Sequence, residues 1–198
     1  MPIIAGIDPG TNGAVALYDT DSHRLVSVED IPSWYQTVGK KKRKRIDTVG
    51  LMELFDMLNV MGVELVVLEA VGGRPRQSAS SGFVFGYTVG LIYMCCMYSK
   101  IMVETVPPQK WKKLLGVPGK QGNKDKEAKK QAVGDILNRA DQLFPHDRGL
   151  FKTERGAIRM DRVDAAFLAK FGGDHVWRTM QPGDIEAKLA YKNAETGA

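Results

Sequence analysis

Cysteine is scarce in this chain of 198 residues: only Cys95 and Cys96 are present, and they are adjacent. Neighbouring cysteines rarely form a disulfide with each other, and no second pair is available to complete a zinc site. We therefore expect two small apolar filling side chains in a reduced, cytoplasmic protein.

The sequence also shows no pattern typical of a secretory leader or of a membrane span. The N-terminus has no basic stretch followed by an apolar core and a cleavage site, so we expect no signal peptide. Residues 77–99 carry no charge, but their apolar part, 83–98, is shorter than the roughly 20 residues that cross a bilayer. We expect a buried or interface helix there, and no membrane partner.

No internal repeat is visible, and the length suits one well-packed α/β domain better than two. The net charge is +5 and the isoelectric point about 9.1. This balance favours a polyanionic partner but says nothing of the fold.

Apolar runs alternate with helix-like patterns along the chain. Strands are expected at 3–8, 13–19, 23–32, 63–70 and 100–108, the first three forming an antiparallel meander. Helices are expected at 48–61 after an Asp47 N-cap, at 83–98, at 109–116, over a segment that ends near Arg139, and at 161–171. The charge run at 40–45 has no period that places it. This order of elements predicts one α/β domain with a mixed sheet.

For two of the expected helices, the apolar residues have to be assigned to a buried face. For 48–61 we expect the core-facing stripe to be Val49, Met52, Phe55, Leu58 and Met61. The 83–98 helix has too many apolar residues for one stripe, so it needs burial on more than one side. Its core side could be Phe83, Tyr87, Leu91, Met94 and Tyr98, with Val84, Thr88, Ile92 and Cys95 on other faces. A C₂ homodimer interface would bury the second side, with Gly86 and Gly90 permitting close approach.

Acidic residues interrupt apolar surroundings at three places. Asp8 ends the first apolar run, Glu69 ends the run at 63–70, and Asp161 and Asp164 share one face of the last helix. Carboxylates packed together repel each other unless a hard divalent cation, Mg²⁺ or Mn²⁺, binds between them. Two such ions about 4 Å apart would clamp the attacking and leaving oxygens of a phosphodiester.

Each acid also has a purely structural explanation. Asp8 could cap its own Asp-Pro-Gly turn. Glu69 could pair with an arginine of the following loop, and the two helical acids could cap their helix or pair with Arg159 or Arg162. Taken together, however, the order and placement of the acids favour a joint metal site.

Two segments are strongly basic. The run at 40–45 could be a solvated loop or a localisation signal, but we favour contact with a DNA backbone, since phosphate contacts supply most non-specific affinity. The second segment, 110–130, contains Trp111. We expect Trp111 to be a packed anchor of an amphipathic turn rather than a base-stacking residue.

Five blocks, taken in order, resemble the RuvC family of Holliday junction resolvases, which belongs to the ribonuclease H-like superfamily. They are GIDPGTNGAVAL, VVLEA, a Gly- and Ser-rich helix start, PPQKWKKLLG followed by GNKDKEAKK, and DRVDAAFLA. The resemblance covers roughly residues 3–171 and implies a ribonuclease H-like α/β fold, with a mixed five-stranded sheet flanked by helices. The pattern weakens after Gly172, so we expect the nuclease domain at 1–175 and a partly disordered tail at 176–198. The wide loops and basic insert suggest a divergent member, encoded by a phage and active in the cytoplasm of its bacterial host.

The resemblance implies an endodeoxyribonuclease of recombination and repair that hydrolyses phosphodiesters in Holliday junctions and other branched DNA. Its four acids, Asp8, Glu69, Asp161 and Asp164, would hold two Mg²⁺ ions, or Mn²⁺ in their place. One ion would activate water and the other would stabilise the leaving 3′ oxygen. The lysines of the family fall near Lys112 and Lys126, and Lys126 is expected to join the catalytic set.

The DNA-contacting residues expected from the basic segments and the resemblance are Lys40, Lys41, Lys42, Arg43, Lys44, Arg45, Arg74, Arg76, Lys110, Lys112, Lys113 and Lys124. One position departs from the family. An aromatic residue three positions after the strand-end glutamate stacks on bases at the junction centre, and here that position is Gly72. The two arginines that follow it could substitute by contacting phosphates, and guanidinium planes also stack on bases.

Two other functions compete. Actin-like sugar kinases open with a similar Gly-Ile-Asp-x-Gly-Thr block, but they have two duplicated domains, and this chain is short and has no second such block. A catalytically silent binder of branched DNA would have the same basic segments, yet all four acids are in place here, which argues against a dead site.

Overall fold

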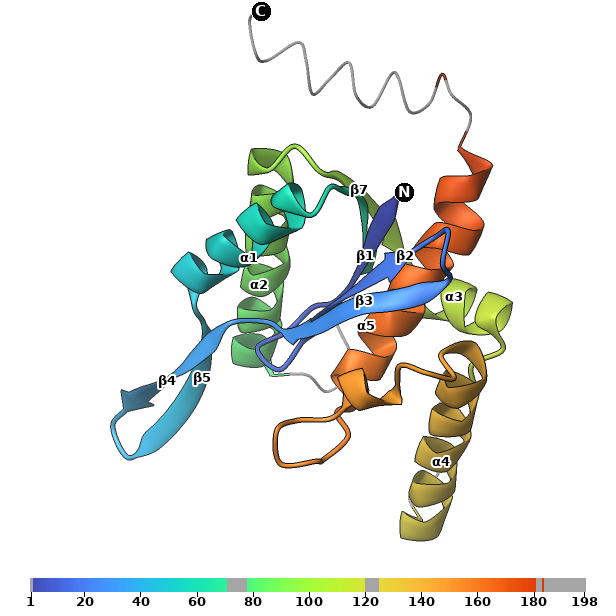
Figure 1. Cartoon of the computed structure of the whole chain (residues 1–198). Helices are drawn as coiled ribbons and strands as arrows, with labels where there is room; N and C mark the ends of the chain where they lie inside the picture. The colour runs from blue at the N-terminus through green and yellow to red at the C-terminus, as the bar shows by residue number, and fades with distance from the viewer. Residues whose placement is uncertain (1, 71–77, 120–124, 181–182, 184–198) are drawn as a thin grey trace, which may run out of the picture.

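A computed structural model describes residues 2–70, 78–119, 125–180 and 183 (Figure 1). Its main sheet has five strands in the order β3-β2-β1-β6-β7. The strands are β1 (Ile3–Asp8), β2 (Ala14–Asp19), β3 (Arg24–Asp30), β6 (Val63–Glu69) and β7 (Met102–Val106). The first three pair antiparallel, whereas β6 runs parallel to both β1 and β7. The predicted mixed five-stranded sheet, with its antiparallel meander, is confirmed.

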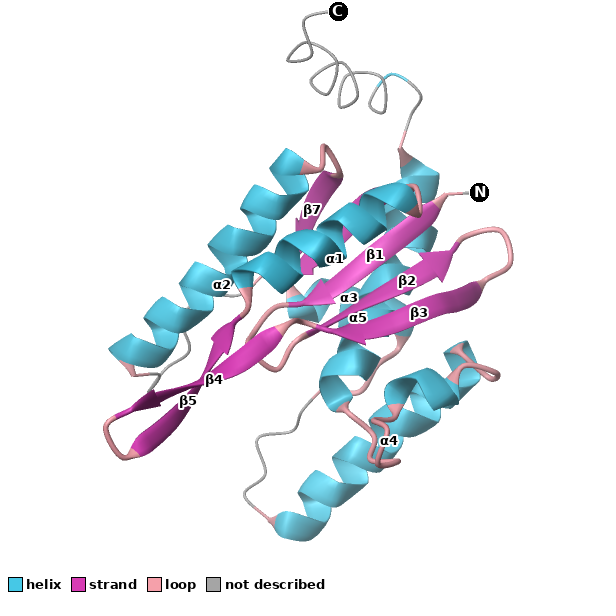
Figure 2. Cartoon of the chain, turned by 60° about the vertical axis from the view of Figure 1, so that its left-hand side comes forward, coloured by secondary structure: helices cyan, strands magenta, loops and turns pink. Residues whose placement is uncertain are grey.

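Helices cover both faces of this sheet (Figure 2). On one face lie α1 (Thr48–Val60) and α2 (Ala79–Tyr98); on the other lie α3 (Pro108–Leu115), α4 (Lys126–Leu143) and α5 (Met160–Phe171). Successive side chains of β1 point to the two faces of the sheet in turn, and so into the two cores. Ile4 belongs to the core beneath α5, and its neighbour Ala5 belongs to the core beneath α1 and α2. All five expected helices are therefore present, with α2 one turn longer at its start and α4 extending past Arg139.

The charge run forms a strand, which the sequence could not place. Residues Lys41–Ile46 are β5, and they pair antiparallel with β4 (Ser33–Val38) in a separate two-stranded hairpin. Gly39, at the turn, has a φ of 60°, the left-handed region that favours glycine. The hairpin projects from the body of the protein beside the end of the sheet (Figure 1).

The expected buried stripe of α1 is only partly correct. Asp47 is the N-cap, accepting a 3.2 Å hydrogen bond from the backbone N–H of Gly50, as predicted. The buried residues are Leu51, Leu54, Phe55 and Leu58, an i, i+3, i+4, i+7 set. Val49 and Met52 are exposed, so the stripe predicted through them has the wrong phase.

In α2 the predicted core face is wrong, and the two sides are exchanged. The buried residues are Thr88, Ile92, Cys95 and Cys96. The exposed residues include Phe83, Tyr87, Met94 and Tyr98, all of them predicted to face the core. Because the helix is apolar on every side, its pattern could not select a face. Ile92, Cys95 and Cys96 belong to the core that α1 and the sheet also line.

The cysteines behave as predicted. Both are free and buried, and burial raises the pKa of Cys96 to about 12, which makes its thiol unreactive. Among the described residues, α2 is the one helix long and apolar enough to cross a membrane by length and composition alone. Core helices of other proteins pass the same test, so this is weak evidence for a span.

The chain stays helical beyond α5. A π-helical turn, Gly172–Val176, and a 3₁₀ turn, Trp177–Thr179, continue from it. A separate 3₁₀ turn, Arg148–Phe151, precedes α5. Most of the expected tail at 176–198 lies outside the described residues.

Candidate active site

Four carboxylates from three elements line a single cleft of about 1160 Å³. Asp8 ends β1 and Glu69 ends β6, and these strands are parallel neighbours, so both acids lie at the same edge of the sheet. Asp161 and Asp164 come from the first turns of α5. The fold thereby brings Asp8 to the same cleft as Glu69, 61 positions later, and Asp164, 156 positions later.

Gly6 explains why α5 lies close enough to bring its acids to β1. A Cβ at this position would overlap backbone atoms of Ala165 and Ala169 in α5. Only glycine permits the strand and helix backbones to approach so closely. Asp8 lies two residues after Gly6, and Asp161 and Asp164 precede Ala165, so this close contact positions both ends of the acidic set.

The turn after Asp8 is built around two more glycines. Gly13 donates a backbone hydrogen bond of 3.0 Å to the carbonyl of Gly10. A Cβ at Gly13 would overlap the carbonyl oxygen of Asp8, so the turn can fold back over the strand end only with glycine there. Gly10, with a φ of 155°, lies in backbone space that other residues rarely adopt. This compact turn forms one wall of the cleft.

An arginine pair fixes the start of α5 to the end of β3 and to the turn after Asp8. Arg159 donates to Asp30 at 2.8 Å, and Arg162 donates to the other oxygen of Asp30 at 2.7 Å. Arg159 also bonds the backbone carbonyl of Asn12 and forms a 3.3 Å ion pair with Asp161. Burial alone would raise the pKa of Asp30, but the hydrogen bond from Arg162 and the charge of Arg159 outweigh it, so this pKa lies below its ordinary value.

Glu69 is held from the opposite side of the cleft by α3. The indole Nε1 of Trp111, which is fully buried, donates a 3.2 Å hydrogen bond to Oε1 of Glu69. Lys112, also in the cleft wall, has its Nζ 4.8 Å from the centroid of the Trp111 ring. The prediction that Trp111 is a packed anchor is confirmed. The sequence did not predict its hydrogen bond to Glu69.

Lys44 connects the hairpin to the acidic cleft. Its Nζ donates a 2.8 Å hydrogen bond to Oδ1 of Asn12, in the turn after Asp8. Burial lowers the pKa of Lys44, and the nearby charge of Arg159 lowers it further, while Asp30 and Asp161 act in the opposite direction. The base of the hairpin therefore places a cation at the mouth of the cleft.

The donor set has the chemistry of a site for a hard cation. Carboxylate oxygens are the ligands that Mg²⁺ and Mn²⁺ prefer, and the four acids of the cleft supply only these. In the described part of the chain, however, no group of three His, Cys, Asp or Glu side chains is arranged so that it could hold an ion. Asp161 already pairs with Arg159, one of the structural explanations raised for it, so an ion that used Asp161 would compete with this arginine.

Comparison with known proteins adds the fold family. No family model and no curated protein matches the sequence. Among solved structures, RuvC of Thermus thermophilus in complex with a Holliday junction substrate matches over 96% of this chain and 96% of its own, with a TM-score of 0.54 and 14% identity. The chain has a RuvC-like fold. The yeast mitochondrial Holliday junction resolvase Ydc2 also matches, over 97% of this chain and 82% of its own, with a TM-score of 0.49 and 14% identity.

On this RuvC-like fold, the expected site residues divide into three groups. Besides the four acids, Arg43, Lys44, Arg45 and Lys112 line the cleft. Six others are exposed and are not among the described residues of its wall: Lys40, Lys41, Lys42, Lys110, Lys113 and Lys126. Lys126 was expected to join the catalytic set. It is the first residue of α4 and is not among the residues that line the cleft. Arg74, Arg76 and Lys124, together with Gly72, lie outside the described residues.

Some residues of the cleft were not anticipated. The start of α2 lines one wall through Ser78, Ser80, Ser81, Val84, Phe85 and Thr88. Ser78 is the N-cap, accepting a 3.2 Å hydrogen bond from the backbone N–H of Ser81. The serine cluster in the sequence was a usable signal for this helix start, because serine is a preferred N-cap. Asp30 and Asn12 had no such signal, since their roles depend on contacts with Arg159 from far along the chain.

Proposed function

We propose that this protein is a metal-dependent endodeoxyribonuclease that cuts branched DNA, four-way junctions in particular. The supporting observation is the cleft that Asp8, Glu69, Asp161 and Asp164 line together with the cations Arg43, Lys44, Arg45 and Lys112. The RuvC-like fold is consistent with this activity, because the T. thermophilus protein of the same fold was solved with a Holliday junction substrate.

The four acids would supply the carboxylate oxygens for Mg²⁺, or Mn²⁺, and binding would have to draw together side chains that line one cleft but are not grouped around one point in this structure. Bound there, the ions would activate the attacking water and stabilise the leaving 3′ oxygen of the phosphodiester. The chain's own contribution is positioning. Trp111 orients Glu69, and Arg159 and Arg162, anchored on Asp30, fix the helix that carries the other two acids. Lys112 and Lys44 supply positive charge where a scissile phosphate would enter.

DNA binding outside the cleft would depend on the hairpin. Five of the six residues of β5 are lysine or arginine, and the strand leads from the exposed turn to the cleft. Phosphate neutralisation by such a strip releases counterions and supplies affinity without regard to sequence. We expect the backbone of one junction arm to follow β5.

A second copy of the chain would give the symmetry that a junction requires. The side chains of Phe83, Tyr87, Met94 and Tyr98, 51–74% exposed, form one apolar stripe along α2, and Gly90 lies in the same stripe. The spacing of these positions, three to four residues, places them on a single helix face. We propose that this stripe forms a C₂ homodimer interface, which would present two equivalent clefts to the two strands that must be cut.

The decisive experiment compares three DNA substrates: an immobile four-way junction, a Y-fork and a linear duplex, each with Mg²⁺ and with chelator. Cleavage of the branched substrates with Mg²⁺ alone, lost in Asp8→Asn, Glu69→Gln and Asp164→Asn while junction binding remains, is expected. Binding without cleavage by the wild type would indicate the catalytically silent binder. An Asp8→Asn variant that cuts at the wild-type rate would overturn the metal-site interpretation.

A further inference from the structure

The hairpin carries exposed aromatic side chains in the middle of its positive charge. Trp34 and Tyr35, adjacent in β4, are 49% and 66% exposed. Each lies directly opposite a cation of β5: Trp34 pairs with Arg45 and Tyr35 with Lys44. Large aromatic surfaces beside cations and in contact with water are a typical feature of proteins that bind single-stranded nucleic acid, where bases stack on the rings and phosphates bind the charges.

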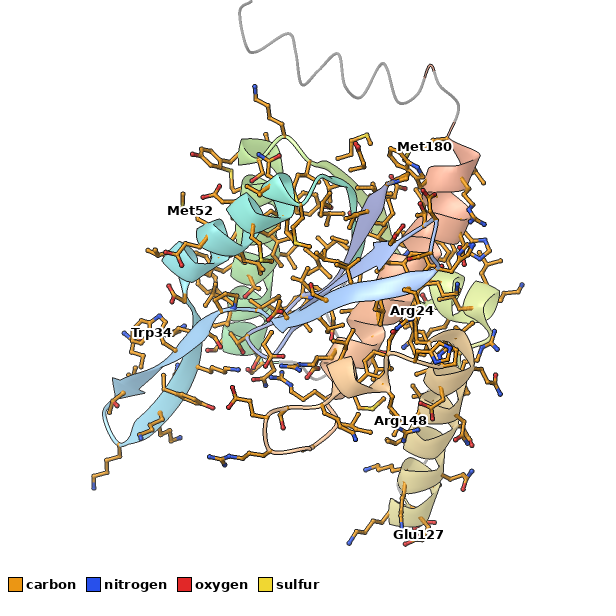
Figure 3. The ribbon with its side chains drawn as sticks, viewed as in Figure 1. Arg24, Trp34, Met52, Glu127, Arg148 and Met180 are labelled. Atoms are coloured by element: carbon orange, nitrogen blue, oxygen red, sulfur yellow. The ribbon has the colours of Figure 1, made fainter. Side chains whose placement is uncertain are left out.

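The register of the hairpin separates the two aromatic residues. Successive residues of a strand point to opposite faces, and paired residues of neighbouring strands share a face. Tyr35 therefore lies on the face of Lys44, whose Nζ reaches Asn12 beside the acidic cleft. Trp34 lies on the opposite face, and Figure 3 shows it projecting on the side of α1. Cations of both faces line the cleft, since Arg45 lies opposite Trp34. Tyr35 is the more exposed ring, and it shares its face with Lys44, the cation that bonds the turn after Asp8.

The same face continues outward along the hairpin with a second cation, opposite Thr37. Lys42, two residues before Lys44, points to the same side and is exposed. The spacing of two residues along a strand is about 7 Å, close to the rise between phosphates of an extended single strand. Two cations on one side of a ring can thus bind successive phosphates while the ring contacts the base between them.

We propose that Tyr35 stacks on an unpaired base next to the branch point, as the DNA strand to be cut passes from the hairpin into the cleft. This inference rests on the proposed function and extends it: the hairpin recognises the single-stranded character of the branch rather than its sequence. Every base has a stacking face, so the contact is tolerant of sequence. A fully paired duplex offers no free base face, so Tyr35 contributes to binding only at branched sites.

The test uses a Y-fork with 2-aminopurine in the single-stranded arm beside the branch, full-length protein, and chelator to keep the DNA intact. Binding of the wild type is expected to quench the fluorescence of the stacked base. Tyr35→Ala should abolish the quenching and weaken fork affinity about tenfold or more, with the affinity for linear duplex unchanged. Its salt dependence should also match the wild type, because no charge is removed.

Two variants serve as controls. Tyr35→Phe keeps the ring and should behave as wild type, and Trp34→Ala removes the ring on the opposite face and should keep the quenching. Tyr35→Ala with wild-type quenching and affinity, or with an equal loss on linear duplex, would overturn the inference. An equal loss in Trp34→Ala would do the same. If instead the wild type neither binds nor cuts branched DNA, the proposed function itself fails, a result that cleavage of the unlabelled fork with Mg²⁺ reveals separately.

Discussion

The indole Nε1 of Trp111 and Oε1 of Glu69 are joined by a 3.2 Å hydrogen bond, across 42 residues of sequence. The ring is fully buried between α3 and α5, with its centroid 5.9 Å from that of Phe167. A rigid, packed donor of this kind fixes the carboxylate in one orientation, and such outer contacts commonly tune metal sites. Trp111 is therefore a positioning residue for an acid that the proposed chemistry requires.

Trp111→Phe tests this role, since it keeps an aromatic ring but removes the N–H donor. We expect the cleavage rate to fall about tenfold and the Mg²⁺ concentration for half-maximal activity to rise, because mutations of residues that orient metal ligands cost on the order of 10–100-fold. Phe151→Leu is the control, as Phe151 is buried in the same core but has no side-chain N–H that could hold Glu69. An equal rise in the Mg²⁺ requirement for both variants would reduce Trp111 to a packing role.

The contact between β1 and α5 predicts a large effect from a small change. Gly6→Ala places a methyl group on the backbone of Ala165 and Ala169, which cannot retreat without moving the helix. We expect the free energy of unfolding to fall by about 3 kcal/mol, the upper range for overpacking. Gly134→Ala, in open space within α4, should instead be neutral or stabilising by up to about 1 kcal/mol. Urea denaturation measures both, and similar values for the two would show that β1 and α5 are not in close contact.

The ion pairs of Asp30 predict a pH dependence of stability. Its pKa is lowered in the folded state, so the carboxylate stabilises the fold above the unfolded pKa of about 4 and loses this effect as the pH falls through the folded value. The difference in unfolding free energy between wild type and Asp30→Asn should therefore be constant from neutral pH down to about pH 5 and shrink below about pH 4. Urea titrations across this range provide the measurement. A difference that persists unchanged at the acid end would contradict the assignment.

The charge of β5 predicts a salt effect. Replacing Lys40 to Arg45 with glutamines should weaken binding of branched and linear DNA alike. It should also flatten the plot of log K against log salt, by about 0.9 for each phosphate that the variant no longer neutralises. Fluorescence anisotropy at several salt concentrations gives this slope. If the slope stays at the wild-type value, the strand is a solvated surface and the DNA backbone follows another path.

The acidic set and the sheet could be read from the sequence because their signals are local. Each strand-end acid directly follows an apolar run, and the helical acids are three residues apart, so element type and placement were visible without tertiary contacts. The turn from Asp8 to Gly13 follows the same logic: its glycines permit backbone approaches that other residues would obstruct.

The hairpin and the face of α2 could not be predicted, for different physical reasons. Lysine and arginine are weak strand formers, so β5 had no signal of its own, and the usable signal was in its partner, where aromatic residues and Val38 lead into Gly39. In α2, apolar residues occur on every side, so the pattern could not show that Ile92 and Cys96 are buried while Phe83 is exposed.

The exposed stripe of α2 provides the last prediction. A side chain at Gly90 would meet no atom within 4 Å in one copy of the chain, so Gly90→Leu should not disturb the folded monomer. In the proposed C₂ dimer the same side chain would hold the two helices apart. We expect the dimer fraction to fall and coordinated cutting of both strands to decline, while single nicks persist.

Sedimentation of the wild type and of Gly90→Leu, at micromolar concentration and without DNA, measures this directly. Gly134→Leu is the matched control, because Gly134 is also a helical glycine in open space but lies on α4, away from the stripe. It should leave the dimer fraction unchanged. A wild type that sediments as a single 21.9 kDa species would remove the dimer proposal, and the apolar stripe of α2 would then require a different partner.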